Sequence, residues 1–171
     1  CVYTAHHADD NAETVLWNLI RGTGLKGLTG IPRRQGPLRR PLLDVTREEL
    51  EAYAAARALG HIHDETNDDP AAASRNYLRL RVMPLLKELN PRAAEHMART
   101  AAILAREDEA LETLAEMEGS NAMVDSAGRA GILTGVLENW PRAASERMVL
   151  QLMGRTAGRR KDFTARHVEA V

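Results

Sequence analysis

The sequence predicts a mostly helical protein that opens with one strand and one helix. Three observations indicate this fold class. Aromatic residues make up only 4% of the 171 residues, whereas Ala and Leu are abundant, and this composition favours helices over sheets. The chain starts with CVYTA, a short β-branched and aromatic run typical of a buried strand. Nearly all later segments place apolar residues at helical spacing between capping residues, glycines and prolines.

The overall composition is that of a soluble globular protein. Hydrophobic residues make up 44% and charged residues 27%, and no apolar run reaches the length that spans a membrane. The net charge of -1 excludes a global positive field, so any nucleic-acid surface must be a local basic patch. The single cysteine, Cys1, excludes an internal disulfide and a cysteine zinc site, which fits the reducing cytoplasm. Because Cys1 leads directly into a strand, we expect a fragment whose N-terminal part is missing.

The first predicted helix begins at Asp10. Asp10 as the N-cap residue and Glu13 three positions later match a capping box. Apolar residues follow at helical spacing, namely Ala12, Val15, Leu16, Leu19 and Ile20. Gly22 is expected to end the helix as its C′ residue. The next stretch, residues 22–42, is rich in Gly, Pro and Arg and is expected to form a long loop.

A second capping box predicts the next helix. It consists of Thr46 and Glu49, and Gly60 is expected to stop the helix. The residues predicted to face inward are Leu50, Tyr53 and Ala54. Residues 61–74 are polar and are expected to form a strand end and a loop.

Two adjoining helices are predicted in the centre of the chain. The first covers residues 75–89 and should kink at Pro84. Its predicted apolar face consists of Leu78, Val82, Leu85, Leu86 and Leu89. The second is long: Asn90 caps it, Pro91 starts it, and Gly119 is expected to break it.

The C-terminal part is expected to continue as a helical domain. Residues 130–141 are predicted to be a short extended piece and a turn, and residues 142–158 a helix. The inward residues of that helix are predicted to be Ala144, Met148, Val149 and Leu152. A last helix is expected over residues 162–171. We divide the chain into two domains, residues 1–72 and residues 73–171.

The polar segment AHHADDNAET, residues 5–14, is the main candidate functional site. It lies where a strand ends and a helix begins, which is where open α/β sheets bind ligands. Backbone N–H groups at such a point favour phosphate, and neighbouring carboxylates can hold Mg²⁺. Alternatively, Asp10 and Glu13 only cap the helix, and His6 and His7 are ordinary loop residues. A metallohydrolase is a further alternative, but adjacent histidines in an extended segment point in different directions.

Basic residues form a second candidate site, a surface for phosphates. Arg21 and Lys26 accompany a Gly-rich stretch whose backbone can approach a ligand closely. Arg75 and Arg79 are one helical turn apart, off the apolar stripe of their predicted helix. Together with Arg33, Arg34, Arg39 and Arg40 they form a local basic surface suited to a nucleic-acid backbone. The alternatives are a solvated face, or ion pairs with the acids of the preceding loop, Asp64, Glu65 and Asp68.

Three segments occur in succession along the first part of the chain: TAHHADDNAETVLWNLIRGTGLKGLTGIP, RRPLLDVTREELEAYAAARALGHIHDETND and SRNYLRLRVMPLLKELNPR. Together they resemble the bacterial tRNA(Ile)-lysidine synthetases, which belong to the N-type ATP pyrophosphatase, or PP-loop, group. The resemblance implies that residues 1–72 are the C-terminal part of a Rossmann-like α/β PP-loop domain. It also implies that residues 73–171 are a tRNA-facing helical subdomain, truncated at its C-terminus. The family's Ser-Gly-Gly-x-Asp-Ser phosphate loop does not occur in the sequence, so we expect the fragment alone to be inactive.

The resemblance implies an enzyme that converts the wobble cytidine of isoleucine tRNA to lysidine. ATP, with Mg²⁺, adenylates the C2 oxygen of that cytosine, and the ε-amine of free L-lysine then attacks C2 as AMP leaves. By resemblance, Asp10 and Glu13 are catalytic, and Asp10 is the candidate Mg²⁺ ligand. The other implied site residues are Thr4, His6 and Arg21 for ATP, and Lys26, Arg75 and Arg79 for tRNA. The oligomeric state, monomer or homodimer, is left open.

Two other functions remain as alternatives. One is a different ligase of the same group, which adenylates another tRNA base or a small-molecule amide. The other is a non-catalytic RNA-binding module, which would bind RNA without any dependence on ATP. Residues 75–91, RNYLRLRVMPLLKELNP, favour the lysidine family over both.

Overall fold

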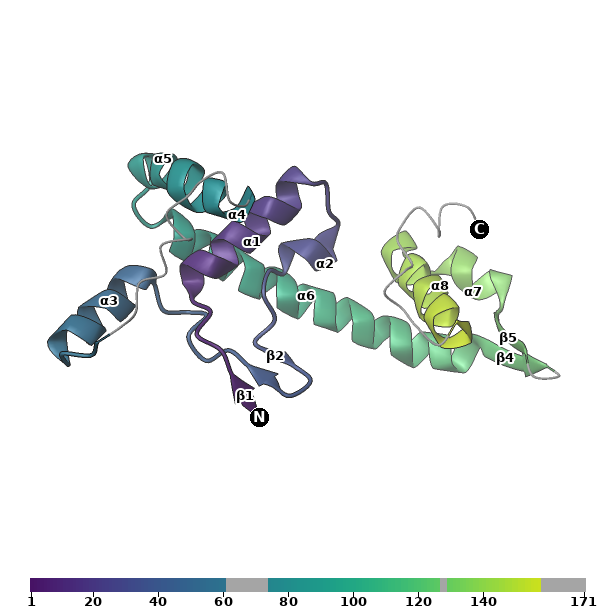
Figure 1. The fold of residues 1–171 in the computed structure, drawn as a ribbon. Coiled ribbons are helices and arrows are strands. Elements are labelled where there is room, and N and C mark those ends of the chain that lie inside the picture. Colours follow the sequence, from purple (N-terminus) through teal and green to yellow (C-terminus); the bar gives the residue numbers. More distant parts are fainter. Residues whose placement is uncertain (61–73, 127–128, 158–171) are drawn as a thin grey trace. The chain divides into compact units, whose positions relative to one another are not determined.

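The computed structural model describes residues 1–60, 74–126 and 129–157 (Figure 1). By its internal contacts the chain divides into two compact units, residues 1–106 and residues 107–171, and each is described by itself. Most described residues are helical and the sheets are small, which confirms the mostly helical fold class. Among the helices described, none is long and apolar enough to cross a membrane.

Part of the predicted organisation lies outside the described residues. Residues 61–73, which make up most of the polar stretch predicted as a strand end and loop, are not described. The last predicted helix, residues 162–171, also lies outside the described residues. The predicted division into residues 1–72 and 73–171 falls at the edge of the first of these gaps and stays a prediction.

A small sheet opens the first unit, with strand order β1-β3-β2. β1 (Val2–Tyr3) pairs in parallel with β3 (Leu38–Arg39), and β2 (Arg34–Gln35) pairs antiparallel with β3. β2 and β3 form a hairpin inside the stretch predicted as a loop, and Gly36 at its turn has a φ of 54°. The predicted strand at the start of the chain is therefore present, but both of its residues are exposed rather than buried.

Helix α1 (Ala8–Ile20) begins earlier than the sequence predicted. Its N-cap residue is His7, not Asp10. The His7 ring nitrogen accepts a hydrogen bond from the Asp10 N–H (3.4 Å), and the Asp10 carboxylate accepts one from the His7 N–H (3.0 Å). The histidine ring thus takes the place that a Ser or Thr hydroxyl takes in the usual capping box. Gly22 ends the helix as predicted, with a φ of 73°.

Two asparagines of α1 hold the Gly-rich segment that comes after it. That segment contains a short helix, α2 (Leu25–Leu28), which the sequence did not predict. Asn18 Nδ2 donates to the carbonyl of Gly27 (2.8 Å), and Asn11 Oδ1 accepts from the Ile31 N–H (2.7 Å). Since both asparagines lie on one side of α1, the segment is fastened along the helix at two points.

Helix α3 (Arg47–Ala56) starts with the predicted capping box of Thr46 and Glu49. It ends at Ala56, before the predicted stop at Gly60. Ala58 adopts the left-handed conformation after the helix, with a φ of 51°. Tyr53, predicted to face inward, is exposed.

The helix predicted over residues 75–89 is interrupted by a π-helical turn. It consists of α4 (Ser74–Tyr77), the π turn η2 (Leu78–Val82) and α5 (Met83–Leu89). Because Pro84 has no N–H, the regular hydrogen-bond ladder cannot continue through it, and the Met83 N–H donates to the carbonyl of Leu78. The extra residue of the π turn rotates the face of α5 by about 100°. Leu78 and Met83 are therefore buried, whereas Leu85 and Leu89, predicted for the same face, are exposed.

The core of the first unit lies between α1, α5 and α6 (Ala93–Ala122) (Figure 1). Its buried residues are Ala12, Met83 and Ala94, and the partly buried residues packed on them are Leu16, Leu86 and Met97. Asn90 caps the start of α6 through a bond from the Arg92 N–H (3.0 Å), but the helix proper begins at Ala93 rather than at Pro91. Gly119 does not break the helix, which continues to Ala122.

The second unit packs α8 (Arg142–Thr156) on the last turns of α6 and on a hairpin of β4 (Met123–Ser126) and β5 (Arg129–Ile132). A short helix, α7 (Thr134–Asn139), occupies the stretch predicted to be extended. The core contains Ala115, Ala144 and Met148, with Ile132, Val136 and Trp140 packed on it. Ala144 and Met148 thus face inward as predicted. Arg147 of α8 joins Asp108 (2.6 Å) and Glu112 (3.1 Å) of α6.

Candidate functional site

The predicted functional segment forms the first two turns of α1, directly after β1. Asp10 and Glu13, three residues apart, lie on one side of the helix and meet arginines of α4 and η2. Asp9 turns instead towards α3 and α5. Glu13 is only 2% exposed, and Asp9 is also buried. Carboxylates this deep require charged or hydrogen-bonding partners, and both have them.

Two arginines bind Glu13. Arg79 Nε donates to Glu13 Oε1 (2.7 Å) and Arg79 Nη2 to Glu13 Oε2 (3.0 Å), which is a bidentate pair. Arg75 Nε donates to Glu13 Oε2 (3.0 Å). The hydrogen bond to Glu13 raises the pKa of Arg79 above its ordinary value, although burial acts in the opposite direction. Glu13 is therefore an ion-pair partner, and the capping role expected for it falls to Asp10.

Asp10 combines a capping role with an ion-pair role. Its Oδ1 accepts from Arg79 Nη2 (3.1 Å) and, at a longer distance, from Arg75 Nη2 (3.4 Å). Its Oδ2 accepts from the His7 N–H of the capping box. Both arginines singled out as a basic surface therefore face the two carboxylates singled out as catalytic. The acids of the preceding loop, the alternative partners for these arginines, lie outside the described residues.

Asp9 joins three elements, and the sequence did not mark it as a site residue. Its carboxylate accepts from Lys87 Nζ of α5 (2.9 Å) and from the Arg47 N–H at the start of α3 (2.9 Å), and it lies 3.8 Å from His7 Nδ1. Burial alone would raise the pKa of Asp9, but the hydrogen bonds from Arg47 and Lys87 outweigh it and lower the pKa. The only sequence signal that could have marked Asp9 as a site residue was its place in the Asp-Asp doublet. Nothing in the sequence predicts that position 9 contacts position 87.

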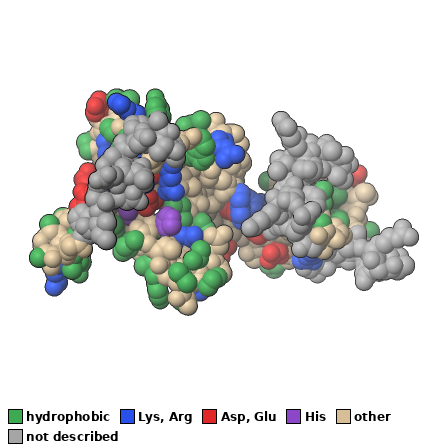
Figure 2. Space-filling model, viewed as in Figure 1, with side chains coloured by type: hydrophobic (Ala, Val, Ile, Leu, Met, Phe, Trp, Pro, Cys, Tyr) green, Lys and Arg blue, Asp and Glu red, His purple; other side chains and the backbone are tan. Residues whose placement is uncertain are grey.

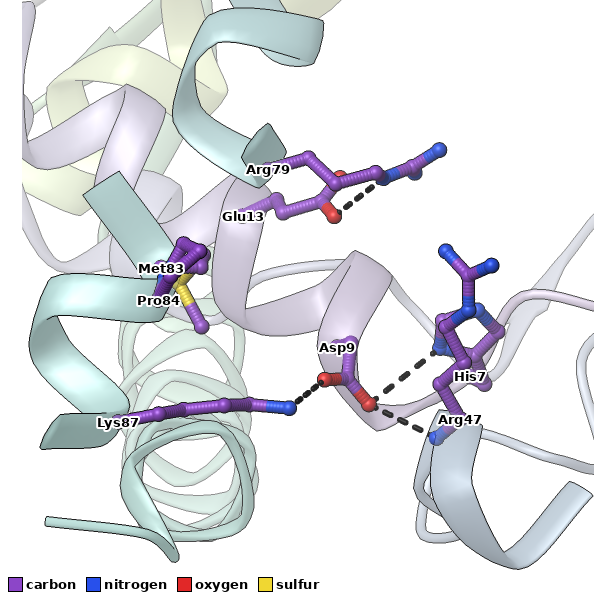
Figure 3. A pocket seen from close by; sticks show the side chains of 8 residues that line it. All are labelled: His7, Asp9, Glu13, Arg47, Arg79, Met83, Pro84 and Lys87. Atoms are coloured by element: carbon purple, nitrogen blue, oxygen red, sulfur yellow. Dashed lines mark hydrogen bonds and ion pairs between the residues drawn. The ribbon is translucent and has the colours of Figure 1, made fainter. Parts of the chain in front are cut away.

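A cavity of about 160 Å³ opens beside these ion pairs. Figure 3 shows its lining, which consists of His7, Asp9, Glu13, Arg47, Arg79, Met83, Pro84 and Lys87. Met83 and Pro84 supply an apolar wall, and the other side chains place carboxylates next to cations. On the face drawn in Figure 2, basic side chains and a histidine reach the surface of the first unit close to one another. Such a lining suits a small ligand that carries both signs of charge.

The residues predicted to bind ATP lie at different ends of α1. Thr4 and His6 are together: Thr4 follows β1, its N–H donates to the carbonyl of Arg39, and its hydroxyl lies 2.9 Å from His6 Nδ1. They thus mark the carboxyl end of the parallel pair β1–β3. Arg21 follows the other end of α1, ~16 Å along the axis from Asp10, and its guanidinium stacks over Trp17. Lys26 is exposed on α2 and does not line the cavity.

Within the described part of the chain, no group of three or more His, Cys, Asp or Glu residues is arranged to hold a metal ion. At Asp10, the predicted Mg²⁺ ligand, Oδ1 faces two guanidinium groups and Oδ2 faces a backbone N–H. Two neighbouring cations oppose the approach of a third.

A comparison with protein families decides where this chain belongs. The family model of the PP-loop domain matches residues 1–86. The chain belongs to the PP-loop domain family. The match includes Asp9, Asp10, Glu13, Arg75 and Arg79, so the ion-pair cluster lies inside the segment that the family model matches.

Several curated proteins that carry the name tRNA(Ile)-lysidine synthase, from different bacteria, are similar to this PP-loop chain. The protein of Pseudomonas fluorescens is 48% identical over 127 residues, which are 72% of the chain and 28% of that protein. The protein of Porphyromonas gingivalis is 52% identical over 100 residues, 58% of the chain and 22% of that protein. The protein of Geobacter sulfurreducens is 38% identical over 173 residues, 99% of the chain and 36% of that protein. The chain thus spans between 22% and 36% of the length of these relatives.

Proposed function

We propose that this PP-loop chain is part of an ATP-dependent ligase that joins L-lysine to C2 of the wobble cytidine of isoleucine tRNA. The observation that carries the proposal is the pair of carboxylates at the start of α1, Asp10 and Glu13, held together by Arg75 and Arg79 within the PP-loop match. The name of the relatives supports it, because the similarity to the Geobacter sulfurreducens protein extends over 99% of the chain.

The parallel pair of β1 and β3, with α1 between them in the chain, supports a further part of the proposal. Parallel strands joined through a helix are the unit of Rossmann-like sheets. We therefore propose that residues 1–72 contribute to a Rossmann-like α/β domain and residues 73–171 to a tRNA-facing helical subdomain. Ligands of such sheets bind at the carboxyl ends of parallel strands, where Thr4 and His6 follow β1.

In the proposed reaction, ATP first adenylates the C2 oxygen of the cytosine, and the lysine amine then displaces AMP from C2. The amine can attack only after it loses a proton, and a carboxylate within hydrogen-bond reach can accept that proton. Glu13 and Asp10 are the carboxylates we assign to this step and to holding the ammonium group beforehand. The mixed charges of the cavity lining, with Asp9 and Glu13 beside Arg79 and Lys87, also suit an amino acid.

The anionic substrates need cationic partners. We assign Thr4, His6 and Arg21 to the nucleotide, and Lys26, Arg75 and Arg79 to the tRNA. Mg²⁺ commonly accompanies ATP. The surroundings of Asp10 do not fit Mg²⁺, however. Both carboxylate oxygens of Asp10 accept hydrogen bonds from N–H groups, and two of these groups belong to positively charged arginines. No step is therefore assigned to a metal ion at Asp10. We place the enzyme in the cytoplasm, together with its tRNA substrate.

The test is incorporation of labelled L-lysine into an isoleucine tRNA transcript by the intact protein that carries this chain, with ATP. Lysine in the tRNA, together with equimolar AMP and pyrophosphate, is the expected result. A matched transcript with uridine at the wobble position should accept no lysine. ATP consumption with another acceptor and no lysine transfer would instead indicate a different ligase of the group. Binding of the tRNA without any ATP consumption would indicate an RNA-binding module.

A further inference from the structure

We propose that Arg75 is a replaceable internal counter-ion: it occupies a cation subsite, made by Asp10 and Glu13, that a primary ammonium group of a ligand takes over by displacing it. The inference rests on the proposed function, because lysine is the ligand whose ammonium group would enter. It assigns to Arg75 control over the affinity of that site, in addition to any contact with tRNA.

Three oxygen atoms converge on the Arg75 guanidinium. Glu13 Oε2 lies 3.0 Å from Arg75 Nε, the Asp10 carbonyl oxygen 3.2 Å from Nη2, and Asp10 Oδ1 3.4 Å from Nη2. The two contacts of Nη2 are longer than the 2.7–2.9 Å or so that is usual for a charged donor on an oxygen acceptor. An ammonium group is more compact and carries three donors that rotate freely, so it can adjust to oxygens that the planar guanidinium meets only at long distances.

Arg79 touches the same carboxylates but is held much more firmly. Its side chain is 24% exposed, against 43% for Arg75. Its shortest bond to Glu13 is 2.7 Å, and a second bond to that carboxylate makes the pair bidentate. Arg75 makes a single bond to Glu13 from a four-residue helix that precedes the π turn. Of the two arginines, Arg75 is therefore the one that a competing cation can displace.

Displacement of Arg75 leaves no buried charge without a partner. Glu13 keeps both of its bonds from Arg79, and Asp10 keeps its bonds from Arg79 Nη2 and from the His7 N–H. The arriving ammonium restores the charge that leaves with the guanidinium. Loss of Arg79 would be different, because the deeply buried Glu13 would keep only the outer arginine.

The consequence is that Arg75 competes with the ligand and weakens its apparent affinity. If the guanidinium fills the subsite for about 90% of the time, its removal should tighten ammonium binding about tenfold. A ligand without an ammonium group at that position gains nothing from its removal. The proposal thus predicts a change that is specific for one functional group of the ligand, which a purely structural ion pair would not produce.

The experiment measures binding of L-lysine and of its analogue L-norleucine, which lacks the ε-amine, to the intact protein by titration calorimetry. Arg75→Gln is compared with the wild type and with Arg81→Gln, a matched control on the exposed side of η2. Lysine should bind Arg75→Gln up to about tenfold more tightly than the wild type, while norleucine should bind all three proteins equally. Arg75→Lys should bind lysine less tightly than Arg75→Gln, because the new ammonium group again competes.

An unchanged or weaker affinity of Arg75→Gln for lysine, in protein shown by its thermal melt to be folded, overturns the proposal. If Arg75→Gln does not fold, the Arg75→Lys comparison with wild type decides. Because an ammonium group competes for these oxygens better than the guanidinium, weaker binding of lysine with equal affinity for norleucine supports displacement, and unaltered or tighter binding of lysine overturns it. The proposed function fails by a different result, the absence of lysine incorporation into tRNA by the wild type.

Discussion

Glu13 and Arg79, 66 residues apart in the sequence, form a bidentate ion pair with distances of 2.7 Å and 3.0 Å. The carboxylate comes from the second turn of α1 and the guanidinium from the π turn. This pair fastens α4, η2 and α5 to the helix that carries the candidate catalytic residues.

Substitution of Arg79 should destabilise the protein strongly. Arg79→Ala leaves the buried Glu13 with Arg75 as its only arginine among the described residues, and breaking a buried pair in this way costs about 3 kcal/mol. Urea unfolding measures the loss. The double variant Glu13→Gln/Arg79→Ala should recover part of it, because no uncompensated charge remains. A loss no larger than that of the surface variant Arg81→Ala, within about 0.5 kcal/mol, would contradict this expectation.

Asp10→Asn should impair catalysis more than folding. We expect turnover in the intact enzyme to fall at least about a hundredfold, the lower range for loss of a base or of an electrostatic group. The asparagine oxygen can still accept the hydrogen bond from the His7 N–H, so the cap of α1 persists. Rates of lysine incorporation and thermal melts measured side by side test this. Nearly normal turnover would leave Asp10 with the capping role alone.

The Asp9–Lys87 pair should give a defined dependence of stability on pH. Partners keep the pKa of Asp9 low against the effect of its burial, and they raise the pKa of Lys87 against the effect of its burial. The contribution of Asp9 is therefore complete above the ordinary pKa of about 3.9 and is lost as the pH falls through the lower folded-state value. The contribution of Lys87 is complete below about 10.4 and is lost as the pH rises through its higher folded-state value.

The measurement is the difference in unfolding free energy between wild type and Lys87→Met across pH. This difference should be largest, and independent of pH, around neutral pH. It should become smaller at strongly acidic and at strongly alkaline pH. The exposed Arg81→Met serves as the control and should show no such profile. The same difference at pH 3 as at pH 7 would show that the pair does not govern stability.

Salt dependence should separate the cations that meet tRNA from those that hold the fold. Lys26→Ala removes an exposed cation, so tRNA binding should weaken and the slope of log K against log salt should flatten by about one phosphate contact. Its melting temperature should hardly change. Arg75→Ala should flatten the slope as well if its guanidinium reaches a phosphate. A fall in melting temperature with an unchanged slope would assign Arg75 to the fold alone.

Gly30 should not tolerate a side chain. Its φ of 67° lies in the left-handed region, and a Cβ there would collide with Asn11 Oδ1, which accepts the Ile31 N–H. Gly30→Ala should lower stability by about 1–3 kcal/mol. The matched control is Gly24→Ala, because Gly24 has a negative φ and open space where a Cβ would lie. Equal stability of the two variants in urea would refute this account of Gly30.

The sequence by itself determined the features that depend on near neighbours. The capping box of Thr46 and Glu49, the end of α1 at Gly22 and the inward face of α8 at Ala144 and Met148 all join residues within a few positions of each other. Such contacts follow from helical geometry alone. The same segment of α1 also carried the resemblance to the family that the PP-loop match then confirmed.

Some local signals were misleading. The sequence predicted Asp10 as the N-cap residue, but the structure uses His7 as the N-cap and Asp10 as its partner in the capping box. In the same way, Pro84 indicated a distortion, but only packing decided that a π turn would bury Leu78 and Met83 and leave Leu85 exposed. A rotation by one residue changes the buried face without changing the composition of the helix.

Only the tertiary structure decided which charges meet. Glu13 is 62 and 66 residues from its two arginines, and Asp9 is 78 residues from Lys87. From the sequence alone, any of the exposed arginines could be the partner of Glu13, because attraction between charges does not depend on their positions in the chain. The burial of Ala12, Met83 and Ala94 against one another brings α1, α5 and α6 together, and this packing places these particular cations over these particular carboxylates.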